Sequence, residues 1–170
     1  SGAMAERSQI EAITSILYPD DTNGIGKQLR LRQEYFLVAA GIGKIVKEYK
    51  AKYGDKEWDK LPERVQIHIN DTHPTMCIPE LMRVLMDEEG VEWDDAWKIV
   101  KATISFTNHT VLPEALEKWS IPEFQELLPR IYMIIDEINR RWQAHLPTED
   151  GNFHKLSRGT SPLWDNEVQM

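Results

Sequence analysis

Two short polar segments carry the residues of this sequence that are best suited to chemistry. One is Asn-Asp-Thr-His at residues 70–73, and the other is Thr-Asn-His-Thr at residues 107–110. Each segment follows an apolar stretch and precedes a Pro-Glu pair typical of a helix start. Together, imidazole, hydroxyl, amide and carboxylate groups offer many hydrogen-bond donors and acceptors. The residue types therefore predict a site for a polar, oxygen-rich ligand, but they specify no reaction.

The same residues allow other interpretations. His73 and His109 could each be turn histidines whose rings are satisfied by backbone partners. A metal site would need four side chains that lack a recognised ligand spacing, namely His68, Asp71, His73 and His109. Glu114 and Glu117 stand at helical spacing, which is typical of a solvated helix face rather than an acid/base pair. The sequence contains no Gly-rich phosphate loop and no nucleophile elbow.

The composition is that of one soluble domain. The 170 residues are 41% hydrophobic, which is enough for a core, and the formal net charge is -8. This acidic balance argues against nucleic acid and against an anionic membrane surface as partners. No apolar run reaches membrane-spanning length. Cys77 is the lone cysteine, which excludes an internal disulfide and fits the cytoplasm. We treat residues 1–4 as a cloning remnant outside the fold.

Apolar periodicity and turn residues divide the chain into helices and two strands. Helices are expected over residues 5–17, 27–53, 79–89, 94–102, 113–119 and 122–143. Strands are expected over residues 65–70 and 103–107. Residues 55–63 form a charged connection, and residues 146–170 form an irregular tail to which no regular structure is assigned.

Single residues sharpen these boundaries. Gly54 is expected to end the long helix, because glycine tolerates the left-handed conformation found there. Asp94 or Asp95 is expected to cap the helix that follows Gly90. Gly41 and Gly43, within the long helix, are expected to mark close packing against a neighbour.

The order strand, helices, strand is that of a βαβ unit, so the two strands are expected to run parallel. In parallel sheets, ligands bind beyond the carboxyl ends of the strands, where residues 70–73 and 107–110 lie. Glu80 and Glu114 follow in first helical turns, where the helix dipole stabilises an acidic side chain. Two strands do not make a stable sheet alone. We therefore expect a helix-dominated α/β fold that is a piece of a larger domain.

Several segments of the chain resemble the glycogen and α-glucan phosphorylases. The matching segments occur in the family's order between about Ile13 and Trp142, and several are long. They are KQLRLRQEYF at 27–36, NDTHP at 70–74, IPELMR at 78–83, TNHTVLPEALE at 107–117, LLPR at 127–130 and INRR at 138–141.

The resemblance implies an internal fragment of a two-domain, GT-B-like glycosyltransferase. Residues 5–145 would be part of its N-terminal domain, and residues 146–170 would be the irregular tail of the same fragment. Such enzymes work in glycogen degradation in the cytoplasm, as homodimers with pyridoxal phosphate. They use inorganic phosphate to release glucose 1-phosphate from α-1,4-glucan ends. The cofactor's lysine would lie outside this chain, so we expect the fragment to be inactive alone.

The resemblance also assigns roles to individual residues. His109 matches the catalytic-site histidine that hydrogen-bonds the glucosyl unit. The pocket beside that sugar would be lined by Asp71, His73 and Asn108. Asp21 matches the acidic member of a mobile loop that gates substrate access, and Asp20 and Thr22 flank it. Better-known animal members have Asn and Phe where this chain has Thr22 and Asn23.

Two alternatives remain beside the phosphorylase interpretation. One is a sugar-nucleotide glycosyltransferase of similar architecture, which would require a nucleotide-activated donor. The other is a non-catalytic glycan-binding module, which would bind maltodextrin tightly without turning it over.

Overall fold

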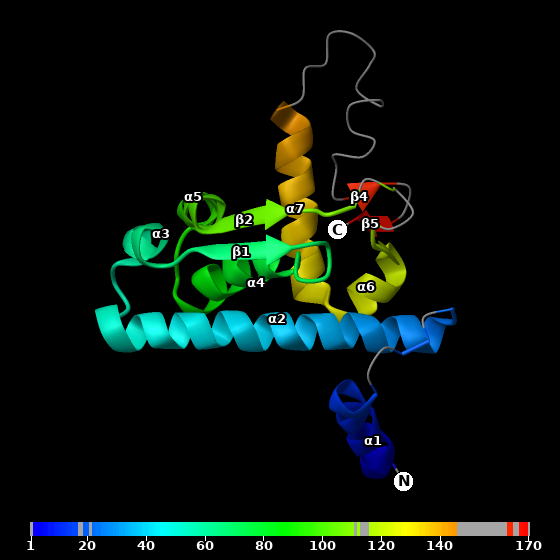
Figure 1. The fold of residues 1–170 in the computed structure, drawn as a ribbon. Helices are drawn as coiled ribbons and strands as arrows, with labels where there is room; N and C mark the ends of the chain where they lie inside the picture. The colour runs from blue at the N-terminus through cyan, green and yellow to red at the C-terminus, as the bar shows by residue number, and fades with distance from the viewer. Residues whose placement is uncertain are drawn as a thin grey trace, which may run out of the picture.

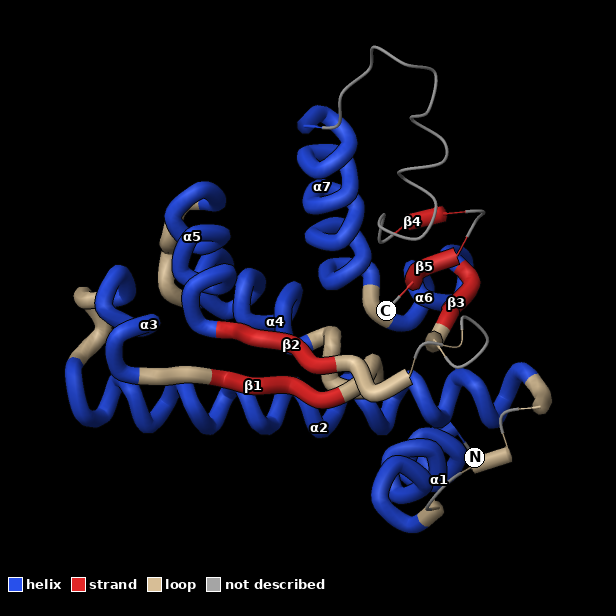
Figure 2. The backbone as a smooth tube through the Cα atoms, turned by 45° about the horizontal axis from the view of Figure 1, so that its top comes forward, coloured by secondary structure: helices blue, strands red, loops and turns tan. Residues whose placement is uncertain are grey.

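The long helix α2 (Gly24–Tyr53) forms the base of the fold. Figure 1 shows α2 running beneath a small sheet, with further helices behind the sheet and to one side. Helix α1 (Gly2–Ser15) projects away from the other elements on the opposite side of α2 (Figures 1 and 2). This computed structural model describes residues 2–16, 19–20, 22–110, 112, 116–145, 163–164 and 167–169.

The boundaries of α2 follow from its sequence. The Asn23 side chain accepts a 2.9 Å hydrogen bond from the Gly26 N–H and so caps the first turn. Gly54 ends the helix with φ 82°, as predicted. The buried stripe is Leu31, Val38, Ile42, Val46 and Tyr49, all of which belong to the apolar stripe that defined the predicted helix.

The close packing predicted at two glycines is wrong. A Cβ atom added at Gly41 or at Gly43 would meet nothing within 4 Å. Both glycines lie on the exposed side of α2, so their small size is not required by any neighbour described here.

The central sheet has two parallel strands, β1 (Ile67–Asn70) and β2 (Ile104–Thr107), as predicted. Ile67 pairs with Ile104, and Asn70 pairs with Thr107. The chain reaches β1 through the short helices η1 (Trp58–Lys60) and α3 (Leu61–Arg64), where only a charged connection was expected. Leu61 is 1% exposed, so this connection contributes to the core.

The crossover between the two strands consists of three helical pieces. They are α4 (Cys77–Arg83), the π-helix η2 (Val84–Glu88) and α5 (Trp93–Thr103). Gly90, with φ 69°, allows the turn between η2 and α5. The predicted cap at Asp94 or Asp95 is wrong, because Glu92 occupies the N-cap position and both aspartates lie in the first turn.

The predicted helix over residues 122–143 is in fact two helices, α6 (Ile121–Leu127) and α7 (Pro129–His145). Pro129 pushes the preceding residue out of the helical region, and Leu128 accordingly has φ -132° and ψ 58°. Ile131, Ile134 and Ile135 of α7 are buried against the core. The apolar face was predicted correctly, but the break was not.

A second, antiparallel sheet was missed. It contains β3 (Lys118–Ser120), β5 (Glu167–Gln169) and β4 (Leu163–Trp164), in that order across the sheet. The helix predicted over 113–119 is therefore wrong at its end, while residues 113–115 lie outside the described part. Val168 is 1% exposed, so this piece of the expected irregular tail is anchored in the core.

Helix α1 contributes little to the core. It begins at Gly2, within the presumed remnant, and Ile10 is 61% exposed. Its predicted last residue, Leu17, lies outside the described residues. Within the described residues, no helix is both long enough and apolar enough to cross a membrane.

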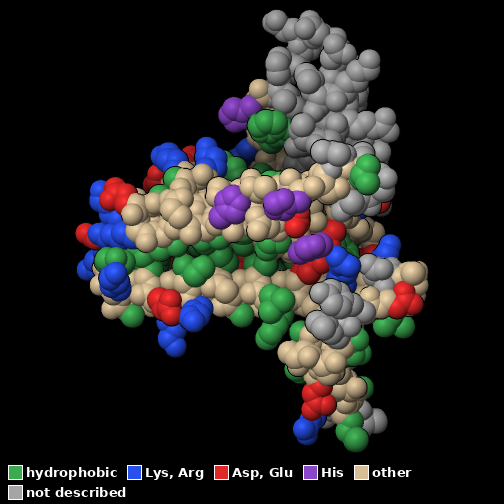
Figure 3. Space-filling view, viewed as in Figure 1, with side chains coloured by type: hydrophobic (Ala, Val, Ile, Leu, Met, Phe, Trp, Pro, Cys, Tyr) green, Lys and Arg blue, Asp and Glu red, His purple; other side chains and the backbone are tan. Residues whose placement is uncertain are grey.

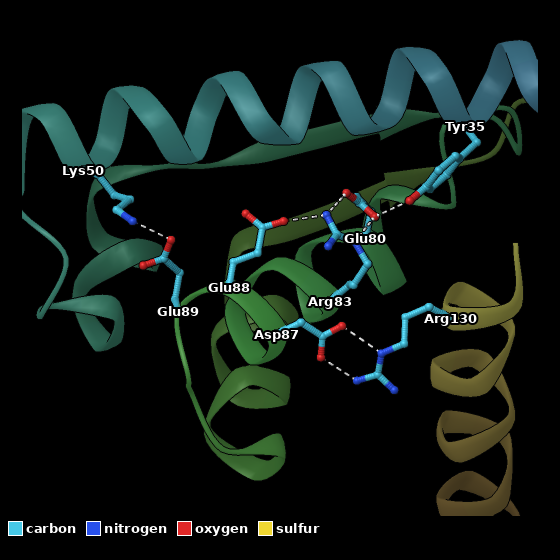
Figure 4. A network of polar contacts seen from close by, with 8 residues as sticks. All are labelled: Tyr35, Lys50, Glu80, Arg83, Asp87, Glu88, Glu89 and Arg130. Atoms are coloured by element: carbon cyan, nitrogen blue, oxygen red, sulfur yellow. Dashed lines mark hydrogen bonds and ion pairs between the residues drawn. The ribbon is translucent and has the colours of Figure 1, made fainter.

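A buried carboxylate joins α2 to α4 (Figure 4). Glu80 is 1% exposed and lies in the first turn of α4, as predicted. Its Oε2 accepts hydrogen bonds from the Tyr35 hydroxyl and from Arg83 Nε, both at 2.9 Å, and its Oε1 accepts from Arg83 at 2.8 Å. Burial, followed by the bond to Glu80, raises the pKa of Tyr35 to about 12. Glu80 is thus a tertiary contact rather than only a favourable charge at a helix start.

Two further ion pairs tie the π-helix and the residue after it to their neighbours (Figure 4). Lys50 of α2 lies 2.6 Å from Glu89. Arg130 of α7 makes a two-pronged contact with Asp87, at 2.8 and 2.6 Å. Such bidentate pairs fix geometry as well as charge.

We expect Glu80→Gln to lower the free energy of unfolding by about 3 kcal/mol, because it leaves Arg83 without its buried counter-charge. Glu88→Gln is the matched control, since Glu88 also contacts Arg83 but its side chain is 51% exposed. That control should cost less than about 1 kcal/mol. Urea unfolding of the two variants measures both values. Equal effects would contradict the role given to Glu80.

Candidate functional site

The two polar turns lie side by side at the carboxyl ends of β1 and β2. The Asp71 N–H donates a 2.8 Å hydrogen bond to the carbonyl of Thr107, which extends the sheet pairing by one residue. The Asp71 Oδ1 atom accepts from the His109 N–H at 3.2 Å. The two turns lie beyond the carboxyl ends of the strands, as predicted, and they contact each other there. Figure 3 shows histidine side chains on the face of the molecule that carries this sheet.

Asp71 reaches His109 because its backbone is left-handed, with φ 61°. This conformation costs most residues about 1–2 kcal/mol, but short polar side chains adopt it more readily. Asn108 is half-buried, and its Oδ1 accepts from the Thr110 N–H at 3.2 Å. The turn that carries His109 is thus held by one hydrogen bond to Asp71 and by another within the turn itself.

The His109 ring is exposed, and it makes no hydrogen bond to another described residue. A neutral imidazole can donate through one nitrogen and accept through the other. The backbone of His109 is held by Asp71, while its side chain is left available to a ligand.

His68 lies on the sheet rather than in the turns. Its ring bridges the strands, with Nδ1 2.9 Å from Ser105 Oγ and Nε2 2.9 Å from Thr107 Oγ1. The alternative metal set of His68, Asp71, His73 and His109 does not come together among the described residues.

His73 belongs to a cluster that reaches α2. Its Nδ1 lies 3.2 Å from Glu117 Oε1, and Arg30 donates to that same oxygen at 2.8 Å. The Thr72 hydroxyl donates to the other Glu117 oxygen at 2.8 Å. Arg30 Nε also contacts Glu34 at 3.1 Å. The side chains of Glu34 and Glu117 are each only 11% exposed.

The solvated helix face predicted for Glu117 is therefore wrong. Glu117 precedes β3 in an irregular segment, and it joins the 72–73 turn to α2. Its proposed companion on that face, Glu114, lies outside the described residues.

Burial shapes the charges of this cluster. Burial, and then the neighbouring Glu117, raise the pKa of Glu34 to about 8. Burial alone would raise the pKa of Glu117, but interactions with Glu34, Thr72 and His73 outweigh burial and lower that pKa. Burial opposes the charge on Arg30, but both glutamates raise its pKa overall. The pKa values of the two carboxyl groups are thus shifted in opposite directions.

The predicted mobile loop is described only in part. The Thr22 N–H and hydroxyl donate to Asp20 Oδ1 at 3.0 and 2.7 Å, and these bonds lower the pKa of Asp20. Asp21 lies outside the described residues. Asn23, one of the departures from animal members, is the N-cap of α2.

Two hollows lie away from these turns. One, of about 490 Å³, is lined by residues of η1, α3 and α5, including Trp58. The other, of about 480 Å³, lies between α5 and α7 and is lined by Trp93, Trp97 and Trp142. Neither contains a predicted site residue, and polar groups converge at the strand ends instead.

Two residues of the site, Arg30 and Glu34, were missed by sequence reasoning, and Glu117 was assigned to a solvated helix face instead. The available signal was weak, because Arg30 and Glu34 form an i,i+4 pair like many on solvated helix faces. Their contact with Glu117 joins distant parts of the chain, and no local pattern predicts it.

Comparisons with known proteins give one consistent result. A family model of the carbohydrate phosphorylases matches residues 1–170. A glycogen phosphorylase of Bacillus subtilis is 53% identical over 139 residues, covering 82% of this chain and 17% of the relative. An α-glucan phosphorylase, H isozyme, of Vicia faba is 51% identical over 138 residues, covering 81% of this chain and 16% of the relative. The brain form of human glycogen phosphorylase is 48% identical over 150 residues, covering 85% of this chain and 18% of the relative. The chain thus spans less than a fifth of these relatives.

We expect Asp71→Ala to destabilise the chain by about 1–2 kcal/mol more than Asp71→Asn. Asparagine keeps a side-chain oxygen for the His109 N–H and tolerates positive φ, whereas alanine does neither. Asp59→Ala, at an exposed aspartate, is the control and should change the free energy of unfolding by less than about 0.5 kcal/mol. Urea unfolding provides the measurement. An alanine variant as stable as the asparagine variant would show that the turn does not depend on this contact.

Proposed function

Because this chain belongs to the carbohydrate phosphorylase family, we propose that it forms the sugar-side wall of the active site in a longer α-glucan phosphorylase. The parent enzyme would transfer the terminal glucosyl unit of an α-1,4-glucan to inorganic phosphate and release glucose 1-phosphate. Its substrates would be glycogen, starch or maltodextrin.

One observation carries this proposal beyond the family assignment. Asp71 holds the backbone of His109 at the carboxyl end of the parallel strands, and the His109 ring faces solvent. Ligands of α/β folds bind at this edge. A hydroxyl-rich sugar suits the donors and acceptors gathered there.

The chemical contribution of His109 is a hydrogen bond to the glucosyl unit. Such a bond accelerates the reaction only where it is stronger in the transition state than in the bound substrate. Glycosyl transfer passes through an oxocarbenium-like transition state, in which hydrogen bonds to sugar hydroxyls strengthen. Asp71 would act through His109 as a positioning residue, and His73 and Asn108 would line the pocket beside the sugar.

Pyridoxal phosphate would supply the phosphate group that relays a proton in the parent enzyme. Covalent attachment of this cofactor requires a lysine. The described residues of the two turns, 70–73 and 107–110, include no lysine, so this site does not fit the cofactor. We place the cofactor's lysine in the part of the parent outside this chain.

The alternatives differ in what they require. A sugar-nucleotide glycosyltransferase would need an activated nucleotide donor and would not depend on phosphate. A glycan-binding module would bind maltodextrin without any turnover.

The test is phosphate-dependent release of glucose 1-phosphate from maltodextrin by the intact parent protein. We expect His109→Ala to lower the rate by roughly ten- to a hundred-fold, the loss of one hydrogen bond worth about 1–3 kcal/mol. His145→Ala, at the exposed end of α7, is the matched control and should leave the rate unchanged.

The outcomes separate the possibilities. Full activity in a folded His109→Ala variant would remove His109 from the site but retain the family function. A parent protein that releases no glucose 1-phosphate would sink the catalytic proposal and favour the glycan-binding module.

The isolated 170-residue chain should release no glucose 1-phosphate and should bind maltodextrin weakly, because it carries one wall of the site. Calorimetric titration with maltodextrin measures the binding. Tight binding by this chain alone would contradict a shared site and support a self-sufficient module.

A further inference from the structure

A pair of buried carboxyl groups joins α2 to the turn that carries Asp71. Glu34 lies on α2 and Glu117 lies just before β3, and each side chain is 11% exposed. Atoms from these two carboxylates and from His73 lie within 4.8 Å of one another. Two carboxylates so close and so buried do not both ionise readily. The junction would exist whether or not the parent acts on glucans.

Among the described residues, one arginine contacts both carboxylates. Arg30 is the guanidinium that contacts both, at 3.1 Å to Glu34 and 2.8 Å to Glu117. His73 Nδ1 lies 3.2 Å from Glu117 and 4.0 Å from Glu34, but its side chain is 57% exposed. Thr72 donates to Glu117 alone. The stabilising donors therefore favour the charge on Glu117.

Glu34 has the opposite environment. Its Oε2 atom is buried and has no hydrogen-bond partner among the described residues. A bare carboxylate oxygen in that position would incur a large desolvation cost. A proton on Glu34 would remove this cost and let Glu34 donate toward Glu117.

We propose that Glu34 and Glu117 share a single proton, held on Glu34, and that this proton fastens the 71–73 turn to α2. With the proton in place, Arg30 neutralises Glu117 and the junction carries no net repulsion. When the proton leaves, two buried negative charges face one guanidinium, and the turn loosens. Asp71 lies in that turn and holds the His109 N–H, so the candidate site loosens with it.

The direction of the pH effect follows from linkage. The pKa of Glu34 is raised to about 8 in the folded chain, from an ordinary value of 4.5. Between these values the folded chain retains a proton that the unfolded chain has lost. Stability is therefore greatest at the acidic end of this window and falls as the pH rises through it. Glu117, whose pKa is lowered in the folded chain, contributes stability that is lost only as the pH falls below this window.

A divalent cation is the competing occupant of this cluster. Glu34, His73 and Glu117 are all metal-ligand types. Arg30, however, already contacts both carboxylates, and a cation would have to displace it. The arrangement therefore favours a proton.

The most direct experiment is a carbon-13 NMR titration of the carboxyl groups in the wild-type 170-residue chain. We expect Glu34 to titrate above pH 7, with the backbone signals of the 71–73 turn shifting at the same midpoint. Titration of both Glu34 and Glu117 below about pH 5.5 would overturn the proposal. This measurement needs no variant and does not depend on how well a substitution folds.

Urea unfolding between about pH 5.5 and 7.5 gives an independent readout. The wild-type folding equilibrium constant should fall up to a hundred-fold over this range, or ten-fold per pH unit for one proton. Glu34→Gln should abolish this dependence, and Glu117→Gln should move its midpoint to lower pH. Glu48→Gln, at an exposed position of the same helix, should behave as wild type.

Three results would contradict the shared proton. They are an unchanged pH dependence in Glu34→Gln, an unchanged midpoint in Glu117→Gln, and a stability gain with micromolar Zn²⁺ at pH 8 that Glu34→Gln removes. The last would instead identify a metal site.

Discussion

The parallel pairing of β1 and β2 is the constraint on which the candidate site depends. The register that joins Asn70 to Thr107 makes both strands end at one edge of the sheet. The Asp71 N–H continues the pairing, and its left-handed backbone turns its carboxylate toward the His109 N–H. A shift of one residue would reverse the faces of β1, exposing Ile69 and burying His68. Burial of the core therefore also fixes the geometry of the site.

Local sequence patterns predicted much of the fold, because they act within one element. The stripe from Leu31 to Tyr49 defines α2, and the alternation in β1 separates buried Ile69 from exposed His68. Failures occurred where distant segments decide the structure. Lys118–Ser120 is a strand because Glu167–Gln169 pairs with it, and no local pattern reveals that partner. The break before Pro129 is different, since the proline was visible but the long apolar face outweighed it.

The candidate site divides in the same way. The two polar turns were predicted to lie at the carboxyl edge of the sheet, because parallel strands end together there. The cluster around Glu117 was not predicted, because it unites α2, the 72–73 turn and the segment before β3. The spacing of charges along the sequence cannot reveal that two carboxyl groups are buried together and contact the same guanidinium. The site thus lies between a hydrogen-bonded sheet edge and the buried carboxyl pair of Glu34 and Glu117.

We propose that the strand ends of this chain bind the terminal glucosyl unit in the parent enzyme. An experimental structure of the intact parent protein with a bound α-1,4-glucan tests it most directly. We expect a sugar hydroxyl within hydrogen-bond distance, about 2.7–3.2 Å, of a His109 ring nitrogen. Asp71 should still hold the His109 N–H in that complex. A glucan end bound in the catalytic cleft away from the 70–73 and 107–110 turns would contradict the account.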